Sequence, residues 1–388
     1  MADKLVTAEW LREATGEQDV RSAKAEDLGP HSGLTSELVI VRSVHGADGE
    51  PGVERTRVLK GVWDEVARGK QVRFGLGREV ELYKAIQPDG ALNHAVLRQV
   101  APEISYAGFN TDGTKLVLME NLCNKGSVEI GKFFGKESLH NWARELDDLP
   151  DGVDWVQVSR ECFRLAAHIH AATWRDDSLI HLDWLRTARW RRGEDREAWE
   201  AVQQAYKAGW AACRAREDLK DIWDSHLVAC MDSALEKASW DGFQARLQSE
   251  PWCFLHGDFH PGNVLRLEDG SIKFVDWEMV ALGSGPKDVA QFLISHPSPA
   301  LRRAEEKGLV DGYIATLREG LAANGVPEVP TSDELWQMYR DGVAWWLSML
   351  VIMLPYTPVP MSRFFHDQVA AFLHDHIPDP ANAPVLRA

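Results

Sequence analysis

The chain is poor in cysteine and has no paired cysteine motif. Its 388 residues include five cysteines, which are Cys123, Cys162, Cys213, Cys230 and Cys253. None of them is part of a CxxC motif, and their number is odd. Such a scattered set argues against both a disulfide framework and a zinc centre, and it favours a reducing compartment. We therefore expect a cytoplasmic protein.

The sequence also lacks a long apolar segment. Its longest mainly apolar stretch, residues 342–354, has 13 residues and ends before Pro355. A helix that spans a bilayer needs about 20 apolar residues. Lys4 is not followed by the sustained apolar core of a signal peptide. These features predict a protein without a membrane partner.

Positive charge is in deficit. The chain has 43 Lys and Arg against 59 Asp and Glu, so its formal net charge is −16. Proteins that bind nucleic acids usually bind the phosphates with clustered basic side chains. This composition therefore argues against a nucleic-acid partner. The hydrophobic fraction of 45%, with 16 tryptophans and 13 phenylalanines, is sufficient for large buried cores. We therefore expect a folded protein, and its negative charge is compatible with a cationic substrate, although such a charge more often only aids solubility.

What the sequence does contain is a polar motif between short apolar runs. Residues 253–278 read CFLHGDFHPGNVLRLEDGSIKFVDWE. The Asp269-Gly270 pair between two apolar runs is a strong signal for a hairpin with a two-residue turn. Counted outward from that turn, Leu267 faces Ile272.

The same count brings two metal-binding groups together. It places Asn263 opposite Asp276, and opposed side chains have Cβ atoms about 4.5–5.5 Å apart. Amide and carboxylate oxygens suit magnesium, a hard cation that keeps several waters for substrate phosphates. Asp258, one short loop away, is then left as the base that orients a hydroxyl for attack on a phosphoryl group. The pattern H-x-D-x-x-x-x-N followed by a metal-binding Asp is typical of kinase-like phosphotransferases.

The motifs HGDFHPGNVL and FVDWE resemble those of the aminoglycoside phosphotransferase and choline-kinase-like superfamily, nearest its ecdysteroid-kinase-like branch. This resemblance implies an α+β, bilobal, protein-kinase-like fold. A small sheet-rich N-lobe would span residues 1–122 and a larger helical C-lobe residues 123–388. The implied activity is transfer of the γ-phosphate of ATP, with Mg²⁺, to a hydroxyl of a small molecule. Trp277-Glu278 replaces the Phe-Gly of protein kinases, which argues against a switchable activation loop. No A-P-E follows, which argues against a protein substrate.

Two residues in the first part of the chain complete a phosphate site. Lys60 ends the strand-like run Arg57–Lys60, and Glu79 lies on the apolar stripe of a helix expected at 74–86. A carboxylate on a buried face needs a partner. A strand lysine paired with a helix glutamate is the phosphate-positioning device of kinases. Glu81 is a competing carboxylate, but it points off the stripe.

Further nucleotide contacts are predicted in a loop and a hinge. The loop at 28–36, with Ser36 as its candidate contact, precedes a strand expected at 37–44. It lacks the full G-x-G-x-x-G but can present backbone N–H groups to phosphates. A plain hairpin turn is equally consistent with it. A second hairpin is expected from 104–109 and 115–119. In the resembled family such a strand ends in a hinge whose backbone binds the adenine, and the matching residues are Met119, Glu120, Asn121 and Leu122.

Three other residues are interpreted as structural. In kinase folds an Asp at the position of Asp288 braces the catalytic loop through its backbone, although a simple helix-start carboxylate is equally consistent with the sequence. His256 is expected to support the same loop. His170, in a helix predicted from the spacing of apolar residues 158–173, matches a structural His-Ala of the resembled family.

The acceptor is expected in the C-lobe, where Glu278, Trp345 and Trp346 are candidate contacts. The two tryptophans are adjacent on what we expect to be one long C-terminal helix that begins at Ser332, so they cannot both face the core squarely. One of them can line a cavity, where an indole covers an apolar ring or a cationic amine. The alternative is that both pack in the core or on the surface.

A metal-dependent hydrolase is a rival interpretation. His256, Asp258 and His260 alternate along an extended segment and, with Asp276, can ligate a metal. Pro261 and the lack of a further paired histidine cluster weigh against this site. It also leaves the predicted lysine–glutamate pair without a role.

A third interpretation is a pseudokinase that binds nucleotide without transferring phosphate. Every catalytic residue type is present, which weighs against it. The sequence leaves open the identity of the acceptor, the preference for ATP or GTP, the oligomeric state and the role of the helical stretch 195–240.

Overall fold

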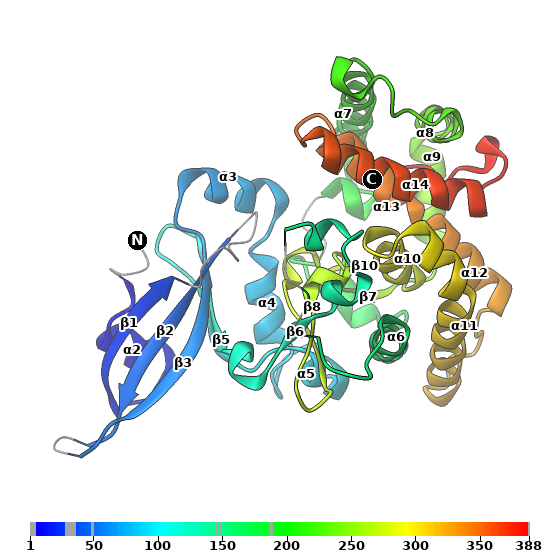
Figure 1. The fold of residues 1–388 in the computed structure, drawn as a ribbon. Coiled ribbons are helices and arrows are strands. Elements are labelled where there is room, and N and C mark those ends of the chain that lie inside the picture. The colour runs from blue at the N-terminus through cyan, green and yellow to red at the C-terminus, as the bar shows by residue number, and fades with distance from the viewer. Residues whose placement is uncertain are drawn as a thin grey trace. The chain divides into compact units, whose positions relative to one another are not determined.

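The computed structural model describes residues 5–27, 36–47, 50–143, 146, 149–185 and 189–386. The chain divides into two compact units. The first comprises Met1–Ser127 with Leu265–Met279, and the second Val128–Val264 with Val280–Ala388. Figure 1 labels their helices and strands. The predicted α+β class, with a sheet-rich first part and a larger helical second part, is confirmed.

The first unit is built on a five-stranded antiparallel sheet of order β1-β2-β3-β5-β4. Its strands are β1 (Val20–Asp27), β2 (Glu37–His45), β3 (Val53–Gly61), β4 (Ile104–Phe109) and β5 (Lys115–Glu120). The strands predicted at 37–44, 57–60, 104–109 and 115–119 are all present. Sequence analysis missed β1, since Val20 is its only fully buried residue and pairing with β2 holds the rest in place.

One helix packs its apolar face on this sheet. In α2 (Ala8–Thr15) Leu11 is fully buried and belongs to a core cluster with Val20, Val41 and Leu118. The helix begins at Ala8, because Thr7 Oγ1 accepts a hydrogen bond of 3.1 Å from the Trp10 N–H and so caps the helix. Figure 1 shows α2 beside the strands β1–β3.

The other helices of this unit are α3 (Glu65–Phe74), α4 (Arg78–Ala85) and α5 (Ala95–Val100). The helix predicted at 74–86 therefore begins four residues late, at Arg78. Gly75 has φ 65° and ends α3 in the left-handed conformation, which separates the two helices. The stripe of α4 is buried as expected, and Glu79 lies on it.

The hairpin of β8 (Val264–Arg266) and β9 (Ile272–Phe274) has a different turn from the predicted one. The Gly270 N–H donates to the Leu267 carbonyl at 3.0 Å, and the Leu267 N–H donates to the Ser271 carbonyl at 2.8 Å. Gly270 has φ 85°. The turn thus has three residues, 268–270, with glycine in the left-handed position after a tight turn.

This turn shifts the register by one residue. Leu267 pairs with Ser271 and not with Ile272, so the predicted register is wrong. Asp269 favours the longer turn because its Oδ1 accepts the Ser271 N–H at 2.9 Å. The joint role of Asn263 and Asp276 as metal ligands consequently rests on the motif resemblance and no longer on the count from the turn.

The second unit is helical. Its helices are α6 (Trp155–Ala172), α7 (Arg196–Arg214), α8 (Ser225–Glu236), α9 (Trp240–Ser249), α10 (Pro286–Ser295), α11 (Pro299–Ala323), α12 (Ser332–Asp341), α13 (Val343–Met353) and α14 (Val359–His376). Its short strands are β6 (Val128–Glu129), β7 (Cys253–Leu255) and β10 (Ala281–Gly283), and β7 pairs with β10 in antiparallel fashion.

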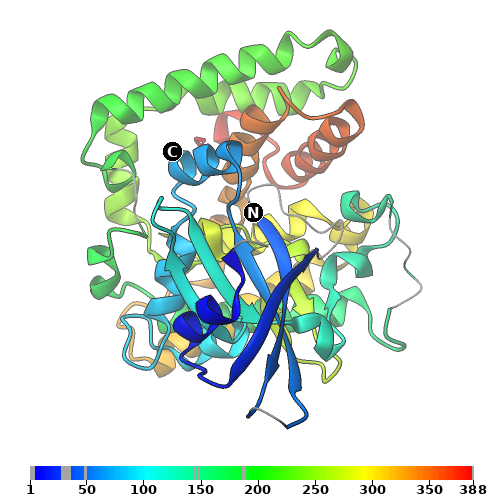
Figure 2. The same cartoon turned by 90° about the vertical axis from the view of Figure 1, so that its left-hand side faces the viewer.

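Within this unit α10 is buried against α11, α12, α13 and α14, while α6 packs along α11. Figure 2 shows α7 running along one side of the unit. In the described part of the chain, no helix is both long and apolar enough to cross a membrane.

The long C-terminal helix predicted from Ser332 is in fact two helices, α12 and α13, and α14 follows them. The N-cap is Thr331, which forms a capping box with Glu334. Gly342 separates the two helices, and its N–H bonds to the Tyr339 carbonyl at 3.0 Å. A Cβ on Gly342 would lie 2.4 Å from the Ala290 side chain, so the crossing with α10 requires glycine at this break.

Candidate active site

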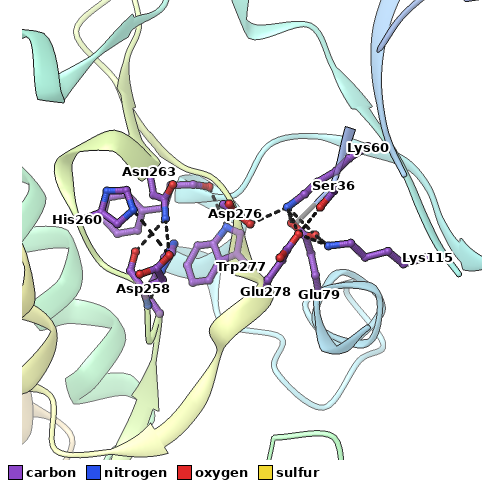
Figure 3. Close-up of polar contacts among 12 residues, drawn as sticks. Ser36, Lys60, Glu79, Lys115, Asp258, His260, Asn263, Asp276, Trp277 and Glu278 are labelled. Atoms are coloured by element: carbon purple, nitrogen blue, oxygen red, sulfur yellow. Dashed lines mark hydrogen bonds and ion pairs between the residues drawn. The ribbon is translucent and has the colours of Figure 1, made fainter. Parts of the chain in front are cut away.

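A closed group of charged side chains lies inside the first unit (Figure 3). Lys60 on β3 places Nζ 2.9 Å from Glu79 Oε2 on α4. The same Nζ lies 2.7 Å from Asp276 Oδ1 and 2.8 Å from Glu278 Oε1. The predicted pair of Lys60 with Glu79 is thus present in the structure. Glu81, the competing carboxylate, lies 3.5 Å from Lys84 instead.

A second lysine binds the same acids, and sequence analysis missed it. Lys115 at the start of β5 is fully buried, with Nζ 2.8 Å from Glu79 Oε2 and an ion pair to Glu278. Ser36 adds a hydrogen bond of 2.5 Å from its Oγ to Glu278. Lys115 shares a strand face with Val117, which pairs with Lys60, but this register is known only from the structure.

The charges in this cluster do not cancel, since three carboxylates face two ammonium groups. Burial opposes the charge on Lys60, but Asp276, Glu278 and Glu79 outweigh it and raise the pKa of Lys60 well above 10.5. Burial also opposes the charge on Glu278, yet Lys60 and Lys115 lower its pKa. For Asp276 burial prevails over Lys60 and raises the pKa to about 6. Asp276 is therefore the acid whose charge is least compensated.

The backbone turns sharply where Asp276 enters the cluster. Asp276 has φ 62°, in the left-handed region that residues other than glycine rarely adopt. The following Trp277 is buried, and its Nε1 donates to the Phe274 carbonyl at 2.8 Å. Strained backbone of this kind concentrates at functional sites because surrounding contacts must maintain it.

The donor set of this cluster fits a magnesium ion. One oxygen from each of Glu79, Asp276 and Glu278 lies within 4.8 Å of the others, and among the described residues these form the group of three that could hold a metal. Carboxylate oxygens are the hard ligands that magnesium prefers. Of the two predicted metal ligands, Asp276 belongs to this group.

The predicted catalytic loop lies in the second unit, directly after β7. Asp258 is partly exposed, and both of its carboxylate oxygens accept hydrogen bonds (Figure 3). Oδ1 accepts from Gln291 Nε2 at 2.8 Å, and Oδ2 accepts from Asn263 Nδ2 at 3.2 Å. Asn263 also donates to the Asp258 carbonyl at 3.0 Å. The loop thus holds the Asp258 carboxylate in a defined orientation.

The loop backbone is braced from α10. Asp288 accepts the N–H groups of His256 at 2.9 Å and Gly257 at 3.2 Å, which is the bracing contact predicted for it. The His256 ring accepts the Asp258 N–H at 3.3 Å. Behind them His170, buried as expected, lies 3.5 Å from Asp288. These contacts fix the path of the chain through the loop.

Gln291 is a second supporting residue, and sequence analysis did not identify it. It follows Asp288 by three positions, so both side chains lie on one face of α10. Its Oε1 accepts the Phe259 N–H at 3.2 Å while its Nε2 donates to Asp258 Oδ1. Gln291 therefore links the loop backbone to the carboxylate that we predict to be catalytic.

The two histidines of the rival hydrolase site accept hydrogen bonds from backbone N–H groups. The Nδ1 atom of His256 accepts the Asp258 N–H, and that of His260 accepts the Gly262 N–H at 3.1 Å. The His260 ring also stacks on His296, with centroids 5.4 Å apart. This arrangement favours loop support over metal binding by the two histidines.

A comparison with protein families finds a match for part of the chain. Residues 139–323 match the phosphotransferase enzyme family. This region is similar to that family. It contains Asp258, Asn263, Asp276, Glu278, Asp288 and Gln291. The predicted superfamily and the prediction of a phosphotransferase enzyme are confirmed, while the nearer placement beside ecdysteroid-kinase-like enzymes stays a prediction.

Solved structures of similar arrangement include three enzymes. The choline kinase LicA of Streptococcus pneumoniae is 13% identical, with 94% of this chain and 98% of that chain covered and a TM-score of 0.46. An ethanolamine kinase of Plasmodium vivax is 11% identical, with 92% and 81% covered and a TM-score of 0.45. An aminoglycoside phosphotransferase of Alicyclobacillus acidocaldarius is 14% identical, with 96% and 94% covered and a TM-score of 0.45. The comparison with curated proteins found no match.

The predicted nucleotide hinge precedes the phosphotransferase region and has its own hydrogen bonds. Met119 and Glu120 end β5, where the Glu120 N–H donates to the Glu103 carbonyl at 2.9 Å. Asn121 caps the short 3₁₀ turn that Leu122 begins. The hinge thus has a defined backbone, and its contact with adenine stays a prediction. In the predicted phosphate loop, residues 28–35 lie outside the described residues, whereas Ser36 binds Glu278 as given above.

The two adjacent tryptophans of α13 have different surroundings. Trp346 is buried and stacks on Phe365, with ring centroids 5.2 Å apart. Trp345 is half-buried and lines a cavity of about 290 Å³ within the second unit. Glu278, the third predicted acceptor contact, lies in the lysine cluster of the first unit. Trp345 is thus the tryptophan that can meet a ligand.

Proposed function

We propose that this protein is a small-molecule kinase that transfers the γ-phosphate of ATP to a hydroxyl group. The observation that supports this proposal is the fixed Asp258 carboxylate in the phosphotransferase region. Gln291 and Asn263 each donate to it, and Asp288 holds the preceding backbone. A carboxylate held in this way can accept a proton from a hydroxyl without having to reorganise.

Asp258 acts as the general base in this proposal. The two amide donors fix the plane of its carboxylate, and a carboxylate oxygen can accept more than one hydrogen bond. As the oxygen of the acceptor attacks phosphorus, its proton passes to Asp258. Gln291 is a positioning residue, because it acts on the acceptor only through Asp258.

Lys60 holds the phosphates of ATP in the same proposal. Its ammonium is charged and buried, and Glu79 together with Lys115 maintains its surroundings. Ser36 and the hinge from Met119 to Leu122 supply the remaining nucleotide contacts. Lysine and glutamate in this relation position phosphates in kinases.

Asp276 and Asn263 are the proposed magnesium ligands, and the carboxylates of Glu278 and Glu79 lie beside Asp276. Magnesium, when bound, supplies positive charge that neutralises the phosphates during transfer. Asp276 provides the negative ligand, which its position in an acid-rich cluster supports.

The acceptor is proposed to be a small molecule that binds in the cavity lined by Trp345. This cavity also reaches Ala281, which pairs with Leu255, three residues before Asp258. The absence of an A-P-E motif and the size of the cavity both favour a small acceptor over a protein. We place the reaction in the cytoplasm, with no nucleic-acid or membrane partner.

A screen of hydroxylated metabolites tests this function. The protein with ATP and magnesium is expected to consume ATP in the presence of its acceptor, and mass spectrometry should show a product that has gained one phosphate. Asp258→Asn should lower transfer by about 10²- to 10⁴-fold while the Kd for ATP stays unchanged, because the base acts on the acceptor. Asp151→Asn, a change of the same chemistry at an exposed position, should have no effect.

Three results would contradict the proposal or a part of it. Binding of ATP without transfer to any compound would indicate a pseudokinase. Hydrolysis that needs zinc and not ATP would indicate the hydrolase instead. Full activity of Asp258→Asn would remove this residue from the role of base.

A further inference from the structure

The cavity beside α13 combines indole rings with charged groups. It has a volume of about 290 Å³ and is enclosed by α9, the segment before β7, β10 and the junction of α12 with α13. Trp252 and Trp345 form part of its apolar wall. Five charged side chains also line it, which are Arg191, Arg246, Glu250, Lys287 and Asp341. Its volume is at the lower end of the range for ligand pockets, so it suits a small metabolite.

Lys287 and Glu250 are in direct contact, whereas Arg246 and Asp341 act on each other only at longer range. Lys287 Nζ and Glu250 Oε1 form an ion pair of 2.5 Å. In the described part of the chain, the Arg246 guanidinium makes neither a hydrogen bond nor an ion pair. Asp341 accepts one hydrogen bond of 3.0 Å from Gln337 and, among the described residues, forms no ion pair.

Arg246 and Asp341 are both half-buried at the cavity. Burial lowers the pKa of Arg246 and raises the pKa of Asp341, and the opposite charges of the two side chains also act on each other. Among the described residues, however, neither of them forms an ion pair, whereas Arg302 elsewhere in this unit directly contacts both Glu306 and Asp375. A ligand that carries both charges could therefore contact Arg246 with its anionic group and Asp341 with its cationic group.

We propose that this cavity binds a small zwitterion. Its anionic group is held by Arg246, its ammonium group by Asp341, and its apolar part lies against the indoles of Trp252 and Trp345. A simple amine would be repelled by Arg246 and a simple acid by Asp341, whereas a molecule with both charges satisfies both side chains. The inference rests on the proposed function only in taking this ligand to be the phosphate acceptor.

Three probes that share a phenol ring and a hydroxyl test the site. They are tyrosine, a zwitterion; tyramine, which has only the ammonium group; and 4-hydroxyphenylacetate, which has only the carboxylate. Calorimetric titration of the full chain without nucleotide should show tyrosine binding about tenfold tighter than either singly charged probe, since it makes one more charge-assisted contact.

Two variants test which charged group of the ligand each side chain binds. Arg246→Met should weaken tyrosine and 4-hydroxyphenylacetate by about tenfold and leave tyramine as tight or tighter. Asp341→Asn should weaken tyrosine and tyramine to the same extent and spare 4-hydroxyphenylacetate. Arg160→Met and Asp333→Asn make the same changes at exposed positions and should alter none of the three affinities.

The outcomes separate this inference from the proposed function. Failure of all three probes to bind at millimolar concentration would overturn the inference, and so would equal losses for every probe in both variants. Phosphate transfer to an unrelated compound, without binding of tyrosine, would refute the inference and leave the kinase intact. Binding with the expected charge pattern but without any ATP-dependent transfer would support the site and contradict the proposed function.

Discussion

Lys115 is a buried charged residue of the first unit that sequence analysis did not identify. It is fully buried and pairs with both Glu79 and Glu278, which also share Lys60. When Lys60 turns to the phosphates of ATP, as we propose, Lys115 remains as the counter-charge of the two glutamates. The cluster therefore has one lysine for the substrate and one for the protein.

Replacing Lys115 by methionine should destabilise the protein. Lys115→Met leaves two buried glutamates with Lys60 as their shared cation, and breaking a buried ion pair on one side costs about 3–5 kcal/mol. Urea denaturation should show this loss in the free energy of unfolding. The double variant Lys115→Met/Glu278→Gln should recover part of it, because it removes one uncompensated charge. An unchanged urea midpoint for Lys115→Met would contradict the assigned role, and Lys207→Met, at an exposed position, is the control.

At the scale of elements, a buried ion network joins three helices of the second unit. Arg302 and Glu306 on α11 lie 2.9 Å apart, and Arg302 binds Asp375 on α14 at 2.6 Å. Glu306 also accepts from Tyr339 on α12 and contacts His376 on α14 at 3.0 Å. These contacts fix α11, α12 and α14 against one another independently of the active site.

This network should make stability depend on pH through Glu306. Burial by itself raises the pKa of Glu306, but His376 and Arg302 outweigh it and hold the pKa below 4.5. A lowered folded-state pKa means that the contribution is complete above about pH 4.5 and is lost as the pH falls further. The free energy of unfolding should therefore differ between wild type and Glu306→Gln at pH 7, and this difference should shrink below about pH 4.5. A difference that is constant with pH would show that Glu306 does not titrate with folding.

At the scale of the whole molecule, the chain runs through residues 128–264 of the second unit before it returns to the first. Residues 265–279 follow the catalytic loop, yet they belong to the unit that contains Lys60 and Glu79. Asp276 and Glu278 thus reach the lysine cluster from a distant part of the sequence. The predicted division at residue 122 is continuous in sequence, whereas the compact units are not.

Ligand binding should slow amide hydrogen exchange, and different ligands should protect different units. A non-hydrolysable ATP analogue with magnesium should protect β3, α4 and residues 265–279 together, because a bound ligand stabilises the segments that hold it. Tyrosine, if it binds as inferred, should instead protect α9 and the junction of α12 with α13. Protection of 265–279 without β3 by the nucleotide would contradict the grouping of these segments into one site.

The sequence by itself determined those features that depend on short-range patterns. Alternation and apolar spacing predicted β2, β4, β5 and α6, since a strand or helix with one buried face repeats every two or every three to four residues. The pairing of Lys60 with Glu79 followed from a carboxylate on a buried face. The bracing by Asp288 came from the motif resemblance, which also indicated the phosphotransferase family.

Only the tertiary structure decided the features that depend on distant partners. Lys115 and Glu278 are 163 positions apart, and no local pattern predicts that this lysine at the start of a strand will be buried beside the glutamate. Gln291 acquires its role because α10 lies against the catalytic loop, and position 342 requires glycine because Ala290 occupies the space of a side chain. In these cases a distant segment decides the arrangement, and its position is known only once the chain has folded. The turn at 268–270 differs for a local reason, because an Asp-Gly pair fits turns of either length.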